Sequence, residues 1–407
     1  MMVKCMHFNT IKIRNDYALT LILFMFSLYS VRILGPVTVA DLGMCSFIVL
    51  SLFFYARVSI NKLFIYYLFW SFFVLLMVFY YIDFHFFSFE KFISTYSRIF
   101  ISILSMMFTP LWLRDKNGLI FINAMKNIFL FLIISQFLVI IIYYLGFDSV
   151  FNLIQHGDQS NRGDWLNVYS YTTYLRFGGL FEEPSWYSWF FIFIMGILVY
   201  SEKIKKQKLI SKKLLILSFF AILFTFSLAG IISFIFLIII RNSNRSVLKA
   251  ILVAIFSIFL FFFLMYFFND SFFDRLYAVA TGSDGSSNNR IIGSISRTIM
   301  SLYESPFGFG IGNSISGIDF YSEKFGINIE SSVSTQNGFS EAIISCGIIL
   351  GIAYLIPIFY LIFGKYSLVL FITISLVFFT TSSIFISPMW FLISAAIFLK
   401  KYMINGQ

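Results

Sequence analysis

Two arginines in the C-terminal half of the chain have a spacing that suits the binding of a diphosphate. Arg290 and Arg297 lie in the sequence SSNNRIIGSISRTIMSLYE, about two helical turns apart. On a helix this spacing places both guanidinium groups on one face. Each guanidinium is permanently charged and offers a planar fork of donors that matches phosphate oxygens. The alternative is an amphipathic helix on the membrane surface, with its arginines among lipid headgroups. The apolar residues that would then face the membrane are Ile291, Ile295, Ile299 and Met300.

A second polar group lies in the sequence YLRFGGLFEEPSWYSWF, just before an apolar run. Arg176 is followed by the adjacent carboxylates Glu182 and Glu183. Pro184 and Ser185 suit a helix N-terminus, where free backbone N–H groups and the helix dipole favour an anion. An anionic ligand would therefore meet this helix end beside Arg176. An ion pair between Arg176 and one of the two carboxylates would explain the same residues without a ligand.

Three glycines alternate in the sequence PFGFGIGNS, at positions Gly308, Gly310 and Gly312. This sequence lacks the Gly-Lys-Ser/Thr ending of a nucleotide-binding loop and the strand that precedes one, which argues against nucleotide binding. Two reasons for the glycines remain: the close approach of the backbone to a ligand, and a tight re-entry toward the membrane.

Four charged residues fall inside apolar runs, where charge is costly and is usually paired or functional. Arg32 and Asp41 lie near the outer ends of the first two runs, and we expect them to form an ion pair. Arg98 and Glu341 lie near the same face as the polar segments described above. These two residues are candidates to line a site there.

Histidine and cysteine form no metal-binding motif in this chain. The histidines are isolated from one another: His7, His85 and His156. The cysteines are scattered and are expected to act as small apolar residues: Cys5, Cys45 and Cys346. We therefore expect no metal and no cofactor.

The composition of the chain requires an apolar solvent. Of its 407 residues, 59% are hydrophobic and only 12% are charged, and the mean hydropathy is +0.89. A soluble domain carries about 25% charged residues. Long uninterrupted Phe, Leu and Ile runs suit transmembrane helices rather than the alternating strands of a membrane barrel. The predicted fold is all-α, with about twelve transmembrane helices in a single integral membrane domain over residues 1–407.

The expected membrane spans follow the apolar runs. They are 17–34, 38–56, 63–82, 95–113, 127–146, 184–201, 214–227, 228–240, 250–268, 339–363, 366–385 and 388–400. The stretch 214–240 carries no charge and suits either one long helix or two short ones. We divide it at residues 227–230, because Ser and Gly are permissive where a short hairpin turns.

The distribution of positive charge predicts the orientation. Most of the 29 Lys and Arg residues fall in segments on the side of the two termini. By the positive-inside rule that side is the cytoplasm, so the protein is expected in a bacterial inner membrane with both termini cytoplasmic. The net charge of +10 is thus a topology signal, and it argues against nucleic-acid binding.

Two segments on the opposite, periplasmic side are too long to be simple connections. The first periplasmic loop covers residues 147–183 and the second covers residues 269–338. Both are rich in Gly, Ser and Asn, and together they hold the arginines described above. No internal repeat relates the two halves of the chain, which argues against a transporter built from inverted repeats.

These residues in this order resemble the O-antigen polymerase (Wzy) family, within the O-antigen ligase and polymerase superfamily. The resemblance rests on RFGGLFEEPS before a span, TFSLAG at a hairpin, Arg290 ahead of SPFGFGIGN, and TQNGFSEAIISCGIILG at the start of a later span. Arg297 and Gly308 also fit an Arg-x10-Gly pattern of the polymerases. One position differs from the ligases, which carry a histidine where this chain has Gln336 before Asn337. This difference favours a polymerase and leaves the base unassigned.

The resemblance implies a metal-independent glycosyltransferase that joins oligosaccharide repeat units carried on undecaprenyl diphosphate. Its implied partners are that lipid-linked oligosaccharide, membrane lipid and a chain-length regulator protein. The arginines expected to hold the diphosphate are Arg176, Arg290, Arg297 and Arg98. The carboxylates expected to accept the proton of the sugar hydroxyl are Glu183, Glu182 and, in reserve, Glu341. The alternatives are an O-antigen ligase, a capsule polymerase, and a flippase for lipid-linked oligosaccharide.

Overall fold

The fold is mostly helical, as the apolar runs predict. The computed structural model describes residues 15–28, 31–34, 37–55, 58–114, 118–147, 177–181, 184–225, 227–242, 293–325, 337–363, 367–380 and 384–404. Within these residues, strand is confined to a small antiparallel pair, β1 (Arg32–Leu34) and β2 (Val37–Thr38). All other regular structure in the described part of the chain is helix.

The helices of the N-terminal half are α1 (Asn15–Ser27), α2 (Val39–Tyr55), α3 (Lys62–Leu76), α4 (Val78–Tyr81), α5 (Phe89–Ser105), α6 (Thr109–Arg114) and α7 (Leu119–Tyr144). Those of the C-terminal half are α10 (Pro184–Lys205), α11 (Lys212–Leu223), α12 (Leu228–Asn242), α16 (Ser294–Glu304), α17 (Ser314–Phe325), α18 (Gly338–Phe359), α19 (Leu368–Thr380) and α20 (Ser387–Ile404), with a short 3-10 helix at Tyr360–Ile362. Several begin at a polar side chain that accepts a hydrogen bond from a free N–H group of the first turn, as at Asn61, Ser211 and Asn337.

Five helical segments of the described residues are long and apolar enough to cross a membrane. They are Lys62–Tyr81, Phe89–Arg114, Leu119–Tyr144, Ser185–Lys205 and Gly338–Ile362. Shorter apolar helices occupy most of the other expected spans, whereas the expected span 250–268 lies outside the described residues. The structure therefore supports a multi-pass membrane protein, and the count of twelve spans stays a prediction.

The uncharged stretch 214–240 is divided into two helices, as the sequence predicts. Helix α11 ends at Leu223 and α12 begins at Leu228. Polar side chains bond the backbone between them: Thr225 Oγ1 accepts a hydrogen bond from Ser227 N at 3.1 Å, and Ser227 Oγ accepts one from Gly230 N at 3.3 Å. These hydroxyls satisfy backbone groups that a continuous helix would have paired internally.

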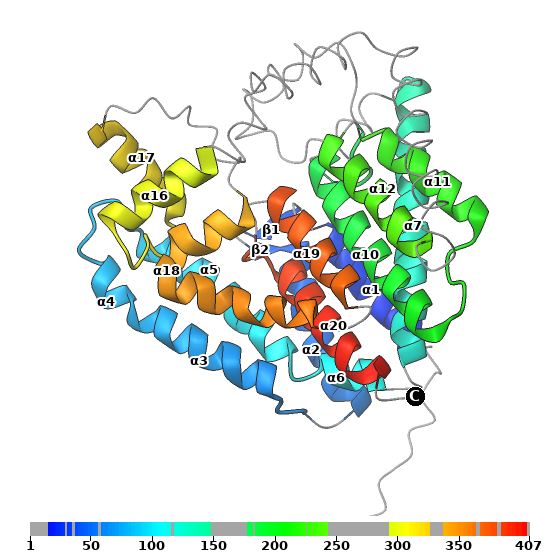
Figure 1. Ribbon diagram of the computed structural model, residues 1–407, viewed down its shortest axis with the longest axis horizontal. Coiled ribbons are helices and arrows are strands. Elements are labelled where there is room, and N and C mark those ends of the chain that lie inside the picture. The colour runs from blue at the N-terminus through cyan, green and yellow to red at the C-terminus, as the bar shows by residue number, and fades with distance from the viewer. Residues whose placement is uncertain are drawn as a thin grey trace, which may run out of the picture.

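Helix α10 is the central helix of the C-terminal half. Every residue from Tyr187 to Ser201 is buried, and the helix packs against α7, α12 and α19 (Figure 1). Gly196 allows the close approach of α19, because a Cβ atom there would lie 2.7 Å from the Cγ2 atom of Thr373. Small residues have this role at many contacts between membrane helices.

Helix α18 packs along α3, and three aromatic side chains of α3 bond its backbone (Figure 1). Pro357 lies inside α18 and cannot donate to the carbonyl of Ala353, four residues earlier. The Tyr66 hydroxyl donates to that carbonyl oxygen instead, at 2.6 Å. The Trp70 indole and the Tyr67 hydroxyl donate to the carbonyls of Leu350 and Tyr354 in the same way.

Replacing Tyr66 with phenylalanine is expected to lower the stability by about 1 kcal/mol, because the carbonyl of Ala353 loses its donor. The midpoint of thermal unfolding in detergent measures this change. Tyr144→Phe is the matched control, since that side chain is 75% exposed at the end of α7. Equal midpoints for the two variants would contradict a role for the Tyr66 hydroxyl.

Contacts between helix ends agree with the sides that the charge pattern assigns. Ser387 at the start of α20 donates to Asp41 at the start of α2, at 2.7 Å, and both ends are expected outside. Arg241 at the end of α12 pairs with Glu202 near the end of α10, and both ends are expected in the cytoplasm. The orientation itself stays a prediction.

Candidate active site

The residues predicted from the sequence to form the site fall into two groups. Arg98, Arg297, Asn337, Glu341 and the loop glycines lie in the described part of the chain. Five others lie outside the described residues, so their placement stays a prediction: Arg176, Glu182, Glu183, Arg290 and Gln336.

Helices α16 and α17 pack against α18 (Figure 1). Polar side chains of the three helices gather at the first turns of α18. We call this cluster the polar junction. Its members are Ser294, Arg297 and Ser301 of α16, Ser314 and Asp319 of α17, Ser340, Glu341 and Ser345 of α18, and Asn337, which caps α18. The second predicted loop thus brings two helices to the end of one candidate membrane span.

The start of α18 is fixed by Asn337 and by a serine of α16. The Asn337 side chain accepts a hydrogen bond from Ser340 N at 2.9 Å, which caps the helix. The backbone N–H of Asn337 donates to Ser294 Oγ at 3.2 Å, and the Ser340 hydroxyl donates to the carbonyl of Ser294 at 3.4 Å. Asn337, which follows Gln336 in the sequence, therefore has a structural role as a helix cap.

Glu341 is held by two serines in the first turn of α18. Its Oε1 atom accepts hydrogen bonds from the hydroxyls of Ser314 on α17 and Ser345 on α18, each at 2.9 Å. Both donors reach the same oxygen, and the second oxygen, Oε2, has no hydrogen bond to another described residue. An oriented carboxylate with one oxygen available suits the acceptance of a proton.

Arg297 supplies a buried positive charge at the polar junction. Only 2% of its surface is exposed. Burial lowers the pKa of the Arg297 guanidinium, and the negative charge of Asp319 on α17 opposes this shift. Arginine nevertheless stays protonated in proteins. A charge buried in this way can stabilise a diphosphate more strongly than the same charge in water.

The environment of Arg297 differs from one alternative for this segment. That alternative is an amphipathic helix on the membrane surface, with its arginines among lipid headgroups and its isoleucines facing the membrane. In the structure Arg297 faces the protein, whereas Ile295 and Ile299 are 55% and 63% exposed. The polar face packs inward because α18 and α17 offer it hydrogen-bonding partners and an opposite charge.

The three loop glycines approach protein rather than open space. Each has a left-handed backbone, with φ values of 82°, 89° and 77°. A Cβ atom at Gly308 would overlap the backbone of α18 at Gly347, one at Gly310 would lie 3.1 Å from the rings of Tyr81 and Phe87, and one at Gly312 would lie 2.6 Å from the carbonyl oxygen of Lys91. The glycines thus let the loop pack tightly between α5 and α18.

The glycine loop inserts into a break in α18. Gly347 has φ 75° and ψ 175°, which ends the helical hydrogen bonding there. The carbonyls of Ile344 and Ser345 accept hydrogen bonds from Phe309 N and Gly310 N, both at 2.9 Å. In return, Ile348 N donates to the carbonyl of Pro306 at 3.1 Å. The loop therefore satisfies three backbone groups of α18 around the break.

Arg98 forms an ion pair with Asp41. Arg98 Nε lies 3.1 Å from both carboxylate oxygens of Asp41. Asp41 also accepts hydrogen bonds from the backbone and hydroxyl of Thr38, and it accepts one from Ser387. The partner of Asp41 in the structure is thus Arg98 of α5. The side chain of Arg32, the expected partner, lies outside the described residues. A diphosphate-binding role for Arg98 stays a prediction, and the arrangement gives it a structural role.

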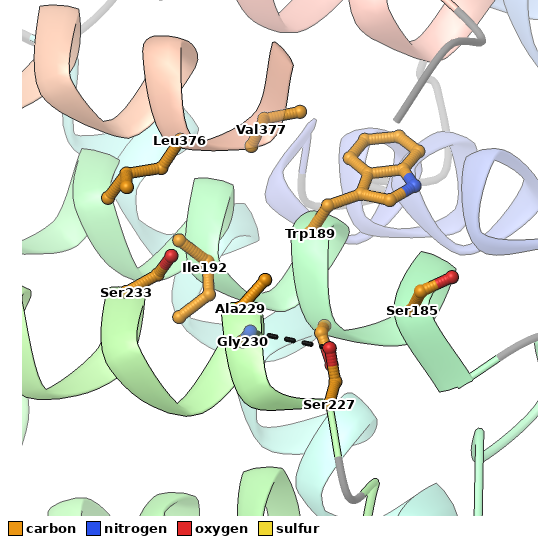
Figure 2. A pocket seen from close by; sticks show the side chains of 10 residues that line it. Ser185, Trp189, Ile192, Ser227, Ala229, Gly230, Ser233, Leu376 and Val377 are labelled. Carbon is orange, nitrogen blue, oxygen red and sulfur yellow. Dashed lines mark hydrogen bonds between the residues drawn. The ribbon is translucent and has the colours of Figure 1, made fainter. Parts of the chain in front are cut away.

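A small serine-lined hollow lies between α10, α12 and α19, and the sequence analysis did not identify it (Figure 2). Its hydroxyl groups come from Ser185, Ser188, Ser227 and Ser233. The close contact between α10 and α12 here depends on Gly230, since a Cβ atom there would lie 2.7 Å from Ser188. The hollow is large enough for a molecule of the size of water and too small for a sugar ring. The signal in the sequence was the pair of serines three residues apart after Pro184.

No group of three or more His, Cys, Asp or Glu side chains that could hold a metal ion occurs among the residues that the structure describes. The polar junction itself holds one arginine, two carboxylates and several hydroxyl groups. These groups can bind an anion and accept a proton.

The fold and the polar junction define a multi-pass helical membrane protein with a buried charged site at the end of one span. Residues 214–355 match the family model described as O-antigen ligase. The matched residues run from α11 into α18 and include the whole polar junction. No curated protein and no solved structure matches the chain.

The family match supports the O-antigen ligase and polymerase superfamily and does not separate the two activities. It supports a glycosyltransferase-type enzyme that acts on lipid-linked sugars in O-antigen biosynthesis.

Proposed function

We propose that this protein is an O-antigen polymerase that joins oligosaccharide repeat units carried on undecaprenyl diphosphate at the periplasmic face of the inner membrane. The observation that carries the proposal is the polar junction, which combines the buried Arg297 with the oriented carboxylate of Glu341. The match over residues 214–355 supports the enzyme class. The presence of glutamine at position 336, instead of histidine, favours polymerase over ligase.

The reaction needs both kinds of group. The bond between the donor sugar and its lipid diphosphate breaks, and a glycosidic bond forms to a hydroxyl of the acceptor sugar. Negative charge develops on the departing diphosphate, where arginine can stabilise it. The acceptor hydroxyl loses its proton to a carboxylate. Glu341 is the one candidate carboxylate of the three whose surroundings are described, and Glu182 and Glu183 remain candidates for the same role.

The first test replaces the charged groups. Arg297→Ala is expected to reduce polymerisation on the order of 10²–10³-fold, the usual effect of removing a donor to developing negative charge. Arg176→Ala and Arg290→Ala are expected to act in the same direction. The readout is the ladder of O-antigen lengths on a lipopolysaccharide gel, with the amount of each variant in the membrane measured by immunoblot. Lys206→Ala is the control, because this residue lies in an exposed turn after α10.

The gel distinguishes the proposed activity from its alternatives. Loss of a polymerase leaves a single repeat unit attached to the lipid core. Loss of a ligase leaves nothing attached while polymer is still made, and loss of a flippase leaves no repeat unit attached. Long ladders from the Arg297→Ala and Arg176→Ala strains at normal protein levels would show that the proposed site is wrong.

A second prediction concerns the proton acceptor. Glu341→Gln keeps an oxygen that can accept from Ser314 and Ser345, so the polar junction is expected to stay folded. If Glu341 accepts the proton, polymerisation falls on the order of 10²–10⁴-fold. Glu182→Gln and Glu183→Gln are measured beside it on the same gel. Normal ladders from Glu341→Gln, with loss in one of the other two variants, would move the base to the first periplasmic loop.

An O-antigen ligase is the second candidate, because the matched family model carries that description. In the ligases a histidine occupies the position of Gln336, and the glutamine side chain cannot ionise, so a base of the ligase kind is absent at this position. A strain lacking this protein that still made full-length polymer on its lipid carrier, with none attached to the core, would establish the ligase.

A further inference from the structure

Helix α16 buries three of its polar side chains and exposes three of its large apolar ones. Ser294, Arg297 and Ser301 are 0%, 2% and 0% exposed. On the opposite face, Ile299 is 63% exposed and Tyr303 is 84% exposed. A helix on the surface of a water-soluble domain has the reverse arrangement. The exposed face of α16 therefore requires an apolar environment.

The exposed face of α16 continues into the outer surface of the candidate membrane spans. The loop after α16 carries Phe307, which is 44% exposed and packs against the ring of Tyr80 with centroids 5.4 Å apart. Tyr80 belongs to the span Lys62–Tyr81. In the same loop, the carbonyl of Pro306 accepts a hydrogen bond from the backbone N–H of Ile348 in α18. The next residue of α18, Ile349, is 68% exposed.

Exposed apolar residues of α3, α4 and α18 mark the surface that these spans present to lipid. Phe79, near the end of the span Lys62–Tyr81, is 79% exposed, and Ile352 of α18 is 47% exposed. Helix α16 packs against α18, and the loop after it reaches α4 through the contact between Phe307 and Tyr80 (Figure 1). The exposed apolar side chains of α16 are thus linked to those of the spans through this loop.

We infer that α16 lies within the membrane boundary, with Ile295, Ile299 and Tyr303 in contact with lipid acyl chains. Its polar face then forms the inner wall of the polar junction. Amphipathic helices commonly lie in this region with their apolar side among acyl chains. Here the polar side is turned toward protein instead of water. The occupant of the exposed face is the lipid of the bilayer.

This placement has a consequence that rests on the proposed function. A lipid-linked oligosaccharide keeps its polyprenyl chain among the acyl chains, and its diphosphate lies at the membrane boundary. Helix α16 would meet the substrate at that depth, with Arg297 on its inner side. The substrate would therefore enter the polar junction sideways from the bilayer, past α16.

Nitroxide accessibility tests the placement without any need for activity. The full chain is made without its natural cysteines (Cys5→Ser, Cys45→Ser and Cys346→Ala) and is reconstituted into vesicles of phosphatidylethanolamine and phosphatidylglycerol. A nitroxide is attached to Ile295→Cys, Ile299→Cys or Tyr303→Cys. Molecular oxygen, which concentrates among acyl chains, and a water-soluble nickel chelate are used as the two relaxation agents. Phe79→Cys is the lipid-facing control and Gln207→Cys, in the exposed turn after α10, is the aqueous control.

The ratio of oxygen to nickel accessibility is expected to be several-fold higher at Ile299→Cys than at Gln207→Cys, and close to the ratio at Phe79→Cys. A ratio equal to that of Gln207→Cys would overturn the inference, because the face would then contact water. Low accessibility to both agents would also overturn it, because the face would then be covered by protein. Lipid accessibility together with normal ladders from Arg297→Ala would leave the placement standing and refute only the proposed function.

Discussion

Replacing Gly347 with alanine is expected to destabilise the protein by about 2–6 kcal/mol and to remove its activity. The backbone of Gly347 lies in a region of φ and ψ that only glycine occupies readily, and a side chain there costs about 1–3 kcal/mol. The added Cβ would also lie 2.5 Å from the carbonyl oxygen of Pro306 and from Phe307 Cα. Overpacking of this kind costs about 1–3 kcal/mol more.

Gly146→Ala provides a matched control for this prediction. Gly146 has the same positive φ of 75° at the end of α7, but no atom lies within 4 Å of its added Cβ. Its replacement is expected to cost only about 1–2 kcal/mol, from the left-handed backbone alone. Unfolding midpoints of the two variants in detergent separate backbone strain from overlap. A Gly347→Ala variant as stable as Gly146→Ala would show that the glycine loop does not pack against α18 as described.

The loss of activity follows from the position of the break. Ser345 both donates to Glu341 and accepts a hydrogen bond at its carbonyl from Gly310 N. Displacement of the glycine loop would therefore move a donor of the candidate base. The glycines, for which the sequence left ligand approach and re-entry toward the membrane open, thus shape α18 beside the candidate base.

The sequence predicted the helices well, because burial in a membrane leaves a strong local signal. Runs of about 20 apolar residues are needed for each span, and the five candidate membrane helices of the described residues each overlap an expected span. The break near Ser227 could also be predicted, since Ser and Gly interrupt an otherwise uniform apolar stretch. Both signals depend only on residues that are neighbours in the chain.

The pairing of charges could not be predicted in this way. Asp41 has Arg32 as its nearest basic neighbour in the apolar runs, yet its described partner is Arg98, 57 residues away. The sequence also did not show that Arg297 faces the protein, because an amphipathic helix such as α16 can bury either of its faces. The choice depends on Asp319 and on the start of α18, and these contacts form only in the folded chain.

The ion pair between Arg241 and Glu202 leads to the second large prediction. Arg241 Nε and Nη2 donate to the two oxygens of Glu202 at 2.5 and 3.0 Å, and Nη2 also donates to the carbonyl of Ile210 at 2.6 Å. Glu202 Oε1 accepts from the backbone N–H groups of Leu209 and Ile210 as well. The side chains are only 13% and 9% exposed. One carboxylate and one guanidinium thus join the ends of α10 and α12 to the turn between α10 and α11.

Arg241→Ala is expected to lower the stability by about 3–5 kcal/mol, because it leaves Glu202 as an uncompensated buried charge. Arg241→Lys keeps the charge but loses the two-pronged geometry, so its cost is expected to be smaller. Adding Glu202→Ala to Arg241→Ala is expected to recover part of the loss, since the unpaired carboxylate is then absent. Lys208→Ala, in the exposed part of the same turn, is the control. If Glu202→Ala lowers the stability of the Arg241→Ala variant by as much as it lowers that of the unchanged protein, the two side chains act independently. The turn would then be held by its backbone contacts.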